Sequence, residues 1–511
     1  MVRLAKAVGV FLMGLALFLG VPGGAVKAAE PVKGGTLNVG FFDDTKTLDP
    51  VYSVALSERQ ILFLMFDNLI DIGPDFSLKP SLATSWEYQN GEKRILLHLR
   101  TDVKFHDGTD FDADAVKWNL DWRMLPETNS PARSQLASAI DNVEVVDKAT
   151  VAINLKQPFP PLLSLLTDRA GLMVSPAAVK KYGKDFGGNP VGTGPFVFKS
   201  WTRGSRIELE RNSAYWQKGQ PYLDSVTFTD ISTAVVGSQR LTTGELDFVA
   251  QITPQNARLL ESSPDIKLVQ ISVGNWYALQ WHWDKPPFNN AKLRQAVAHA
   301  VDRQKINALL WSGKGRIANS ETPPGLWWSP SDQEHYSYDP AQAKKLLAES
   351  GYDTAIEIPL SAPSDTALRQ LVQLVKENLE AIGLKVRLEP IAQSEWYARA
   401  VAKQINFTPM RWTLRADPDG LIQFLFDTKG AANSTGYSNP EVDKLIAQAH
   451  GTSDIATRKN LYDQIHQYIA EDLPYVSLAF SGEFVAMNKK VDGFVQMPDL
   501  IPRYRTLWKN K

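Results

Sequence analysis

LRQLVQLVKENLEAIGLKVRL, residues 368–388, contains the pattern that decides the fold class. Leu368 to Ile382 predicts an amphipathic helix, with apolar residues returning at helical spacing. Gly383 follows where a glycine commonly ends a helix, and Leu384 to Leu388 alternates as a β-strand does. A helix followed at once by a strand is the repeating unit of an α/β protein.

The same kind of unit occurs along the rest of the chain. Asp339-Pro340 and Asn439-Pro440 each predict a helix that opens with a capping side chain and a proline, and Gly351 ends the first of these helices. The other predicted elements are a strand at 34–40, a helix at 57–70, a hairpin of strands at 86–88 and 94–100, and a helix at 113–124 capped by Asp112. No fixed repeat and no Pro/Ser-rich linker divides the chain, so we expect lobes that exchange strands.

Length and composition limit the class of protein. The chain has 511 residues, of which 44% are apolar and 22% charged, and this is typical of a soluble globular protein with two or three lobes. Its formal net charge is −1, and it has no run of Lys or Arg that would bind nucleic acid or an anionic membrane.

The N-terminus predicts export. Arg3 and Lys6 precede an apolar run from Ala7 to Val21, which is shorter than the ~20 residues of a membrane-spanning helix. Val26 and Ala28 place small residues at positions −3 and −1 of a cleavage site. They predict that a signal peptide, residues 1–28, is removed after Ala28. The chain has no cysteine, which excludes disulfides, thiolate metal sites and lipid attachment to an N-terminal Cys. We therefore expect a protein that diffuses freely in a Gram-negative-type periplasm.

The sequence lacks the common catalytic motifs. It has no His-Glu-x-x-His, G-x-S-x-G, P-loop or S-x-x-K, and its seven histidines are scattered without metal-ligand spacing. The sequence therefore predicts no catalytic residue, no metal site and no cofactor, and we expect that the protein is not an enzyme.

Two groups of residues are candidates for ligand binding. The first is aromatic and clustered, and aromatic side chains can line a cleft as well as a core: Tyr277, Trp281, Trp283 and Tyr397. Trp281 and Trp283 alternate with His282, which predicts one shared strand face. The second group is Trp412, Arg415 and Asp417, an aromatic platform with charges of both signs. Its structural alternative is a surface turn in which Arg415 pairs with Asp417 or Asp419.

Motifs in a fixed order then identify a family. From Gly34 to about Tyr504 the chain resembles the peptide- and nickel-type extracytoplasmic solute-binding proteins of ABC importers, family 5. The matching stretches are GGTLNVG at 34–40, LDP at 48–50, P-x-LA-x-SW at 80–86, LR-x-DVKFHDG at 99–108, F-x-ADAV at 111–116, VGTGPF at 191–196, RN-x-x-YW at 211–216, GELDFV at 244–249, LRQAVAHAVDR at 293–303, YDP-x-x-AKKLL at 338–347 and GYSNPEVDKLI at 436–446.

The resemblance implies a periplasmic-binding-protein-like α/β fold of type II, with two hinged lobes and an extra domain inserted in the first. It places lobe I at 31–75, 192–280 and 495–511, the inserted domain at 76–191 and lobe II at 281–494. Closure of the lobes would bury a small ligand between them.

The resemblance also implies the function: capture of a small solute and its delivery to ABC permease subunits in the inner membrane, by a monomer. In peptide-binding relatives an Asp after a Trp pairs with the ligand amine. The position that matches this Asp is Arg415 in the present chain. Those relatives also hold the ligand carboxylate with an Arg, and the position that matches it lies near Ala362, so that Arg is missing here. These changes favour a peptide-like anionic ligand, with Arg415 on an anion and Asp417 on any amine. The alternatives are a metal chelate, an opine or an oligosaccharide, and a secreted hydrolase.

Overall fold

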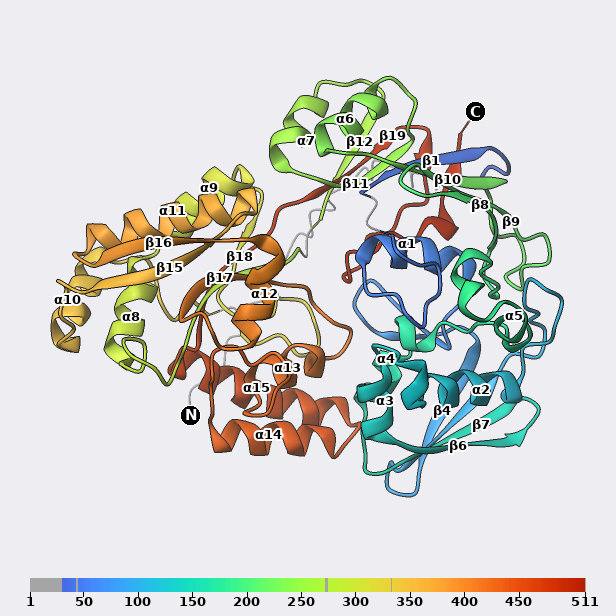
Figure 1. The fold of residues 1–511 in the computed structure, drawn as a ribbon, viewed down its shortest axis with the longest axis horizontal. Helices are drawn as coiled ribbons and strands as arrows, with labels where there is room; N and C mark the ends of the chain where they lie inside the picture. Colours follow the sequence, from blue (N-terminus) through green and yellow to red (C-terminus); the bar gives the residue numbers. More distant parts are fainter. Residues whose placement is uncertain (1–29, 43–44, 272–273, 332, 511) are drawn as a thin grey trace, which may run out of the picture. The chain divides into compact units, whose positions relative to one another are not determined.

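The largest sheet is assembled from segments far apart in the sequence. The computed structural model describes residues 30–42, 45–271, 274–331 and 333–510. In Figure 1 the blue strand β1 lies beside the green β10 and β11, with the red β19 beyond them. The strand order is β12 (Ile266–Gln270), β19 (Phe484–Asn488), β11 (Phe248–Ile252), β1 (Thr36–Phe41), β10 (Ser225–Asp230), β9 (Arg206–Arg211) and β8 (Phe196–Thr202). Strand β1 is parallel to both of its neighbours, and the outer pairs are antiparallel.

Two further sheets have four strands each, one within residues 83–155 and the other from four segments between residues 276 and 480. One has the order β4 (Ala83–Gln89), β5 (Arg94–Leu99), β7 (Thr150–Leu155), β6 (Ile140–Asp147), and the other has β14 (Arg316–Ile317), β18 (Tyr475–Phe480), β13 (Trp276–Trp281), β17 (Phe407–Trp412). Two-stranded pairs complete the set: β15 (Glu357–Pro363) with β16 (Lys385–Ile391), β2 (Ile70–Ile72) with β3 (Leu78–Pro80), and β20 (Val491–Asp492) with β21 (Trp508–Lys509).

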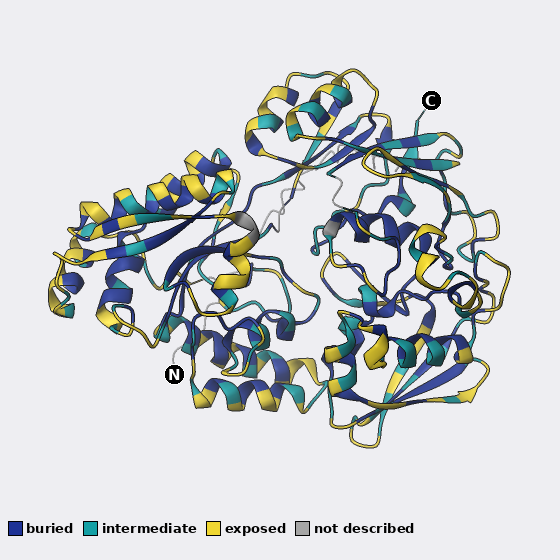
Figure 2. Ribbon diagram, viewed as in Figure 1, coloured by how far each residue is buried: buried dark blue, intermediate teal, exposed yellow. Residues whose placement is uncertain are grey.

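The helices pack their apolar sides on these sheets. They are α1 (Leu56–Met65), α2 (Ala113–Met124), α3 (Arg133–Ala139), α4 (Pro161–Leu165), α5 (Pro176–Tyr182), α6 (Ala234–Thr242), α7 (Pro254–Leu260), α8 (Ala291–Ala300), α9 (Arg303–Trp311), α10 (Pro340–Ser350), α11 (Thr366–Ala381), α12 (Gln393–Val401), α13 (Ile422–Phe426), α14 (Pro440–His450) and α15 (Ile455–Asp472). In Figure 2 the outer sides of α11 and α14 are exposed, whereas the strands are mostly buried. Strand and helix residues thus share continuous apolar cores.

The local signals of the sequence are largely confirmed. Helix α11 begins after Asp365, whose side chain accepts a hydrogen bond from the Leu368 amide at 2.9 Å, and β16 follows it in parallel register with β15. Asp112 caps α2 and Asp339 caps α10 through their carboxylates. Gly351 ends α10 with φ +67°, a left-handed conformation that glycine adopts without a Cβ penalty.

Helix α1 is shorter than the helix expected at 57–70. The Phe66 amide still bonds to Leu62, but the residue itself is extended, and the Leu69 amide bonds instead to the distant Gly171. The glycine turn before β8 packs against this end of the helix, where a Cβ on Gly194 would lie 2.5 Å from the Leu64 carbonyl oxygen. Pairing with remote backbone, which no local pattern reports, therefore ended the helix early.

Two short segments connect the first sheet to the sheet of β13, β17 and β18. One joins β12 to β13 and includes the described residues 271, 274 and 275, and the other joins β18 to β19 at 481–483. The Ser481 amide donates to the Asn275 carbonyl at 2.9 Å, so the segments are in contact. Strand β13 pairs with β17 and β19 pairs with β11, and the lobe boundaries at 280/281 and 494/495 expected from the resemblance stay predictions.

Candidate ligand-binding site

The first wall of the site lies at the carboxyl ends of parallel strands. Strands β10 and β11 flank β1 on opposite sides, and open α/β sheets bind ligands in the crevice at such a point. A cavity of about 460 Å³ is present there, and its lining includes Gly40 and Phe41 of β1, Asp230 of β10, Gln251 of β11 and Gln60 of α1. Gln251 has φ +60°, a conformation uncommon outside glycine and often found at functional sites.

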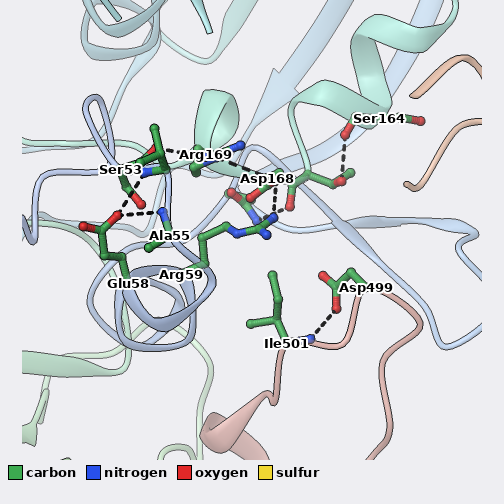
Figure 3. A network of polar contacts seen from close by, with 12 residues as sticks. Ser53, Ala55, Glu58, Arg59, Ser164, Asp168, Arg169, Asp499 and Ile501 are labelled. Atoms are coloured by element: carbon green, nitrogen blue, oxygen red, sulfur yellow. Dashed lines mark hydrogen bonds and ion pairs between the residues drawn. The ribbon is translucent and has the colours of Figure 1, made fainter. Parts of the chain in front are cut away.

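The start of α1 holds a buried carboxylate. Glu58 Oε1 accepts hydrogen bonds from the amides of Lys46 and Thr47, and Oε2 accepts from those of Val54 and Ala55, at 2.9–3.2 Å. Burial alone would raise the pKa of Glu58, but these amides lower it. Backbone donors at the helix start thus saturate this carboxylate, as Figure 3 shows in part.

Next to Glu58, arginines gather around Asp168. Figure 3 shows the Arg59 side chain reaching Asp168, with Nη1 2.8 Å from Oδ2. Arg169 Nε lies 3.9 Å from the same oxygen, and its Nη1 donates to the Ser53 carbonyl at 2.9 Å. Burial alone would raise the pKa of Asp168, but the charges of Arg59, Arg169 and Arg415 lower it to about 2. We call Arg59, Arg169 and Arg415 the arginine cluster.

Arg415, in the loop after β17, lies close enough to Asp168 and Arg59 for their charges to affect one another's pKa. It is exposed to solvent, yet its pKa is lowered, first by burial among surrounding protein atoms and then by the charge of Arg59. A solvent-accessible group with protein on most sides lines a concave surface. A Cβ on Gly420 would lie 2.4 Å from the Arg415 Cβ, so the glycine permits the loop to fold closely beneath this residue.

Two aromatic residues predicted for the site lie beside Arg415. Tyr397 is exposed, and its ring meets Trp412 edge to face at 5.9 Å. The hydroxyl of Tyr397 is close enough for Arg415 to affect its pKa, which burial raises. Trp412 is buried, and its indole N–H has no partner among the described residues. The structure therefore brings Arg415, Trp412 and Tyr397 together with Arg59 and Asp168, more than 200 residues away.

Asp417 has a different role from the one predicted. Arg458 of α15 donates to both of its carboxylate oxygens, at 2.8 and 2.7 Å, and the pair is buried. Asp419 accepts from Tyr462 Oη at 2.6 Å and contacts His450 Nε2 at 2.6 Å. The alternative surface pair of Arg415 with Asp417 or Asp419 is therefore wrong, and we no longer propose Asp417 as an amine ligand, because both of its oxygens are occupied.

Three predicted aromatic residues belong to the core. Trp281 is 1% exposed, stacks on Phe288 at 5.0 Å and donates to the Leu473 carbonyl. Strand β13 ends at Trp281, so Trp283 lies beyond the strand whose face it was expected to share, and it donates to the Asp472 carbonyl. Tyr277 is buried, and Arg411 Nη1 contacts its hydroxyl at 3.5 Å. These contacts are structural, and a ligand role for the three residues stays a prediction.

A larger cavity of about 790 Å³ is lined in part by Trp276, the cross-strand neighbour of Trp412. Its lining includes Trp276, Tyr475, Glu321 and His466. His466 Nε2 must donate to the Trp328 carbonyl, 3.0 Å away, because a carbonyl only accepts. Nδ1 lies 2.5 Å from Glu321 Oε1. This buried pair joins residues 145 positions apart, and no sequence motif signals it.

The sheet of β4 to β7 contacts α14 and α15. Ser453 Oγ donates to Glu92 Oε1 at 2.8 Å, and Phe159 meets the His450 ring edge to face at 5.8 Å. Burial alone would lower the pKa of His450, but Asp419, with Asp417 behind it, raises the pKa above 6.5. A titratable group thus lies at this contact.

We expect His450 to make stability depend on pH. Because its folded pKa is raised, its contribution is complete below its ordinary pKa of 6.5 and is lost as the pH rises through the folded value. The melting temperature of the parent should therefore fall more between about pH 6 and about pH 8 than the melting temperature of the His450→Gln variant. Equal slopes for the two proteins would show that His450 does not titrate in this range.

Among the described residues, no helix combines the length and the apolarity needed to cross a membrane, and no group of three or more His, Cys, Asp or Glu side chains could hold a metal ion.

Comparisons with known proteins agree with this architecture. The sequence model of the bacterial extracellular solute-binding proteins, family 5 (middle region), matches residues 77–433. The glutathione-binding protein GsiB of Salmonella paratyphi A is 31% identical over 464 residues, which is 89% of this chain and 90% of that protein. GsiB of Pectobacterium atrosepticum is 32% identical over 467 residues, again 89% and 90% of the two chains.

Solved structures match over nearly the whole chain. The oligopeptide-binding protein AppA from Bacillus subtilis, in complex with a nonapeptide, is 25% identical with a TM-score of 0.79, covering 94% of this chain and 100% of that one. AgaA of A. tumefacien R10, in complex with agropinic acid, is 28% identical with a TM-score of 0.78, covering 93% and 99%. The fold is thus that of the periplasmic binding proteins, and the chain belongs to the bacterial extracellular solute-binding proteins of family 5.

Proposed function

We propose that the chain is the periplasmic substrate-binding component of an ABC importer and that it captures a peptide-like anionic solute. It delivers the solute to permease subunits in the inner membrane, acts as a monomer and catalyses no reaction. The observation that carries the ligand class is the proximity of Arg415, near Trp412 and Tyr397, to Arg59, Arg169 and Asp168, which are close enough for their charges to act on one another. Guanidinium forks bind carboxylates in two-point contacts, and aromatic rings cover apolar groups.

In this proposal α1 with strands β1, β10 and β11 belongs to one lobe, and β17 with Arg415 in the loop after it belongs to the other. The hinge in this proposal lies at the two connections whose described residues include Asn275 and Ser481, which share a backbone hydrogen bond, and the sheet of β4 to β7 belongs to the inserted domain. Rotation at two short adjacent segments changes the distance between the walls while leaving each sheet intact. A ligand that contacts both walls stabilises the closed arrangement.

An opine is the second candidate. AgaA, at 28% identity, is described in complex with agropinic acid. The GsiB relatives are named for glutathione, and AppA was solved with a nonapeptide. These peptide ligands support a peptide-like solute as the first candidate. Both classes carry carboxylates that suit the arginine cluster.

Mass spectrometry of small molecules released from the purified protein tests the function. We expect a bound compound with at least one carboxylate, which rebinds saturably and is recovered intact. Consumption of the compound on incubation with the protein would point to a hydrolase, and a neutral sugar would exclude the anionic class.

Export is predicted to remove residues 1–28. Residues 1–29 lie outside the described part of the structure, so this expectation rests on the sequence. Mass analysis of the periplasmic fraction should find a chain that begins at Ala29. A full-length chain retained in the membrane fraction would contradict it.

A further inference from the structure

We propose that contacts made by Phe76, Glu92 and Phe159 form a latch, and that this latch sets the affinity for solute without touching the solute. The three residues fall in the predicted inserted domain, 76–191. Their partners fall in predicted lobe II, 281–494, and are Trp328, Ser453 and His450. The inference rests on the lobe closure of the proposed function, because it assigns the latch to the closed arrangement.

Phe76 is held in a conformation that an aromatic residue rarely adopts. It lies in the turn between β2 and β3 with φ +61°, and in this turn the Gly73 amide donates to the Ser77 carbonyl at 2.8 Å. The Phe76 residue is 2% exposed, and its ring lies 5.7 Å from a ring of Trp328. A bulky residue at positive φ persists only where its surroundings hold it, and such strain is common in segments that switch. The strained turn thus presents Phe76 to Trp328.

Glu92 makes a contact that is only half satisfied. It lies in the turn between β4 and β5, where Asn90, Gly91 and Glu92 all have positive φ. Its Oε1 accepts a hydrogen bond from Ser453 Oγ at 2.8 Å, whereas Oε2 is buried and has no hydrogen-bond partner among the described residues. A buried carboxylate oxygen without a partner costs free energy that contact with water would recover. Opening of this contact would return Oε2 to solvent, so the contact is suited to form and break.

Phe159 meets the same part of the second lobe. Its ring meets the His450 ring edge to face at 5.8 Å. His450 is the last residue of α14, and Ser453, the partner of Glu92, lies in the connection from α14 to α15. Glu92 and Phe159 therefore reach one place, the turn between these two helices.

The partners of the latch converge on Asp419. Trp327, next to Trp328, lies with its ring 6.1 Å from that of Tyr462, and Tyr462 Oη donates to Asp419 Oδ1 at 2.6 Å. His450 Nε2 lies 2.6 Å from the other oxygen of the same carboxylate. Asp419 belongs to the loop after β17, which also carries a residue proposed to bind the solute. The latch and the binding loop are thus joined through one buried side chain.

Such a latch changes affinity through the population of the closed arrangement. When a protein binds its ligand in one of two arrangements, the apparent dissociation constant is the intrinsic value divided by the populated fraction of that arrangement. The latch adds a ring contact, a hydrogen bond and an edge-to-face contact to the closed arrangement alone. Weakening it should raise the dissociation constant and expand the free protein, while every contact to the solute stays the same.

Small-angle scattering of cross-linked protein tests whether the latch opens. The chain has no cysteine, so Glu92→Cys/Ser453→Cys introduces a single pair of thiols. A short bismaleimide should join them, and the joined, ligand-stripped protein should have a smaller radius of gyration than the same variant blocked with N-ethylmaleimide. Lys376→Cys/Glu380→Cys, one turn apart on α11, is the matched control and should show no difference. An equal radius for the joined and blocked latch variant, or a latch pair that does not join while the control pair does, would overturn the inference.

Calorimetric titration of the mature protein with glutathione, the compound for which the GsiB relatives are named, tests whether the latch sets affinity. Phe76→Ala should raise the dissociation constant about tenfold, because the closed arrangement loses a buried ring contact. Ser453→Ala should raise it about threefold, because it removes one hydrogen bond. Phe105→Ala is the matched control. It removes a ring that is 3% exposed from the core beside β4 to β7, so it should lower the melting temperature without changing the dissociation constant.

The outcomes separate the latch from the proposed function. A lowered melting temperature of Phe76→Ala with an unchanged dissociation constant, as in the control, would overturn the latch and leave the proposed function intact. If Phe76→Ala does not fold, Ser453→Ala decides by the same criterion. If glutathione does not bind the parent, glutathione is excluded as the solute, and the scattering comparison decides the latch by itself.

Discussion

Replacing Arg458 with alanine should destabilise the protein by about 3–5 kcal/mol, because it leaves the Asp417 carboxylate buried without its partner. Arg458 and Asp417 have side chains 3% and 9% exposed, and two hydrogen bonds join them. Burial alone would lower the pKa of Arg458, but the adjacent Asp417 carboxylate raises it, and burial raises the pKa of Asp417. Urea unfolding followed by tryptophan fluorescence measures the loss.

Two further variants control this experiment. Arg387→Ala removes an arginine whose side chain is 53% exposed and whose partners are Glu357 and Glu389, and it should cost at most about 1 kcal/mol. The double variant Asp417→Ala/Arg458→Ala should be more stable than the sum of the single losses implies, because it buries no lone charge. A loss below about 1 kcal/mol for Arg458→Ala would mean that Asp417 is solvated or protonated in the folded protein.

Arg415→Ala should weaken binding of the identified ligand by about 2–5 kcal/mol, since it leaves a ligand anion unpaired in the closed site. Arg415→Lys should recover only part of the affinity, because a point charge does not replace a planar fork. Folding should be little affected, as Arg415 is exposed. Arg399→Ala, on the exposed face of α12, is the matched control and should bind like the parent. Affinity of Arg415→Ala within twofold of the parent would remove Arg415 from the site.

The sequence predicted the elements whose signals are local. Asp365 and Gly383 mark the ends of the α11 region through a side-chain cap and a glycine turn, and both signals lie within a few residues of the helix. The family motifs predicted the fold class for a similar reason. Each motif is a short stretch of neighbouring residues, and the motifs follow one another along the chain in a fixed order. The end of α1 could not be predicted in this way, because the Leu69 amide pairs with Gly171.

The proposed ligand-binding site combines residues that the sequence suggested with residues that it did not. Arg415, Trp412 and Tyr397 come from a single region, and the structure places them together. Asp168 and Arg59 were missed, since their contact joins residues 109 positions apart and arginine next to aspartate is common in any sequence. Asp417 was misjudged because its partner lies 41 positions away on another helix. The sequence shows which residues carry a charge. Which charged residues pair with each other depends on the folded structure, because the partners are far apart in the sequence.

The central claim is that the chain binds a peptide-like anion and does not transform it. Calorimetric titration of the mature, ligand-stripped protein with the compound released from it, followed by chromatography of the same sample, tests this claim most directly. The account predicts one saturable site per chain, affinity that depends on Arg415, and full recovery of the unchanged compound. Loss of the compound, or heat without saturation, would contradict it.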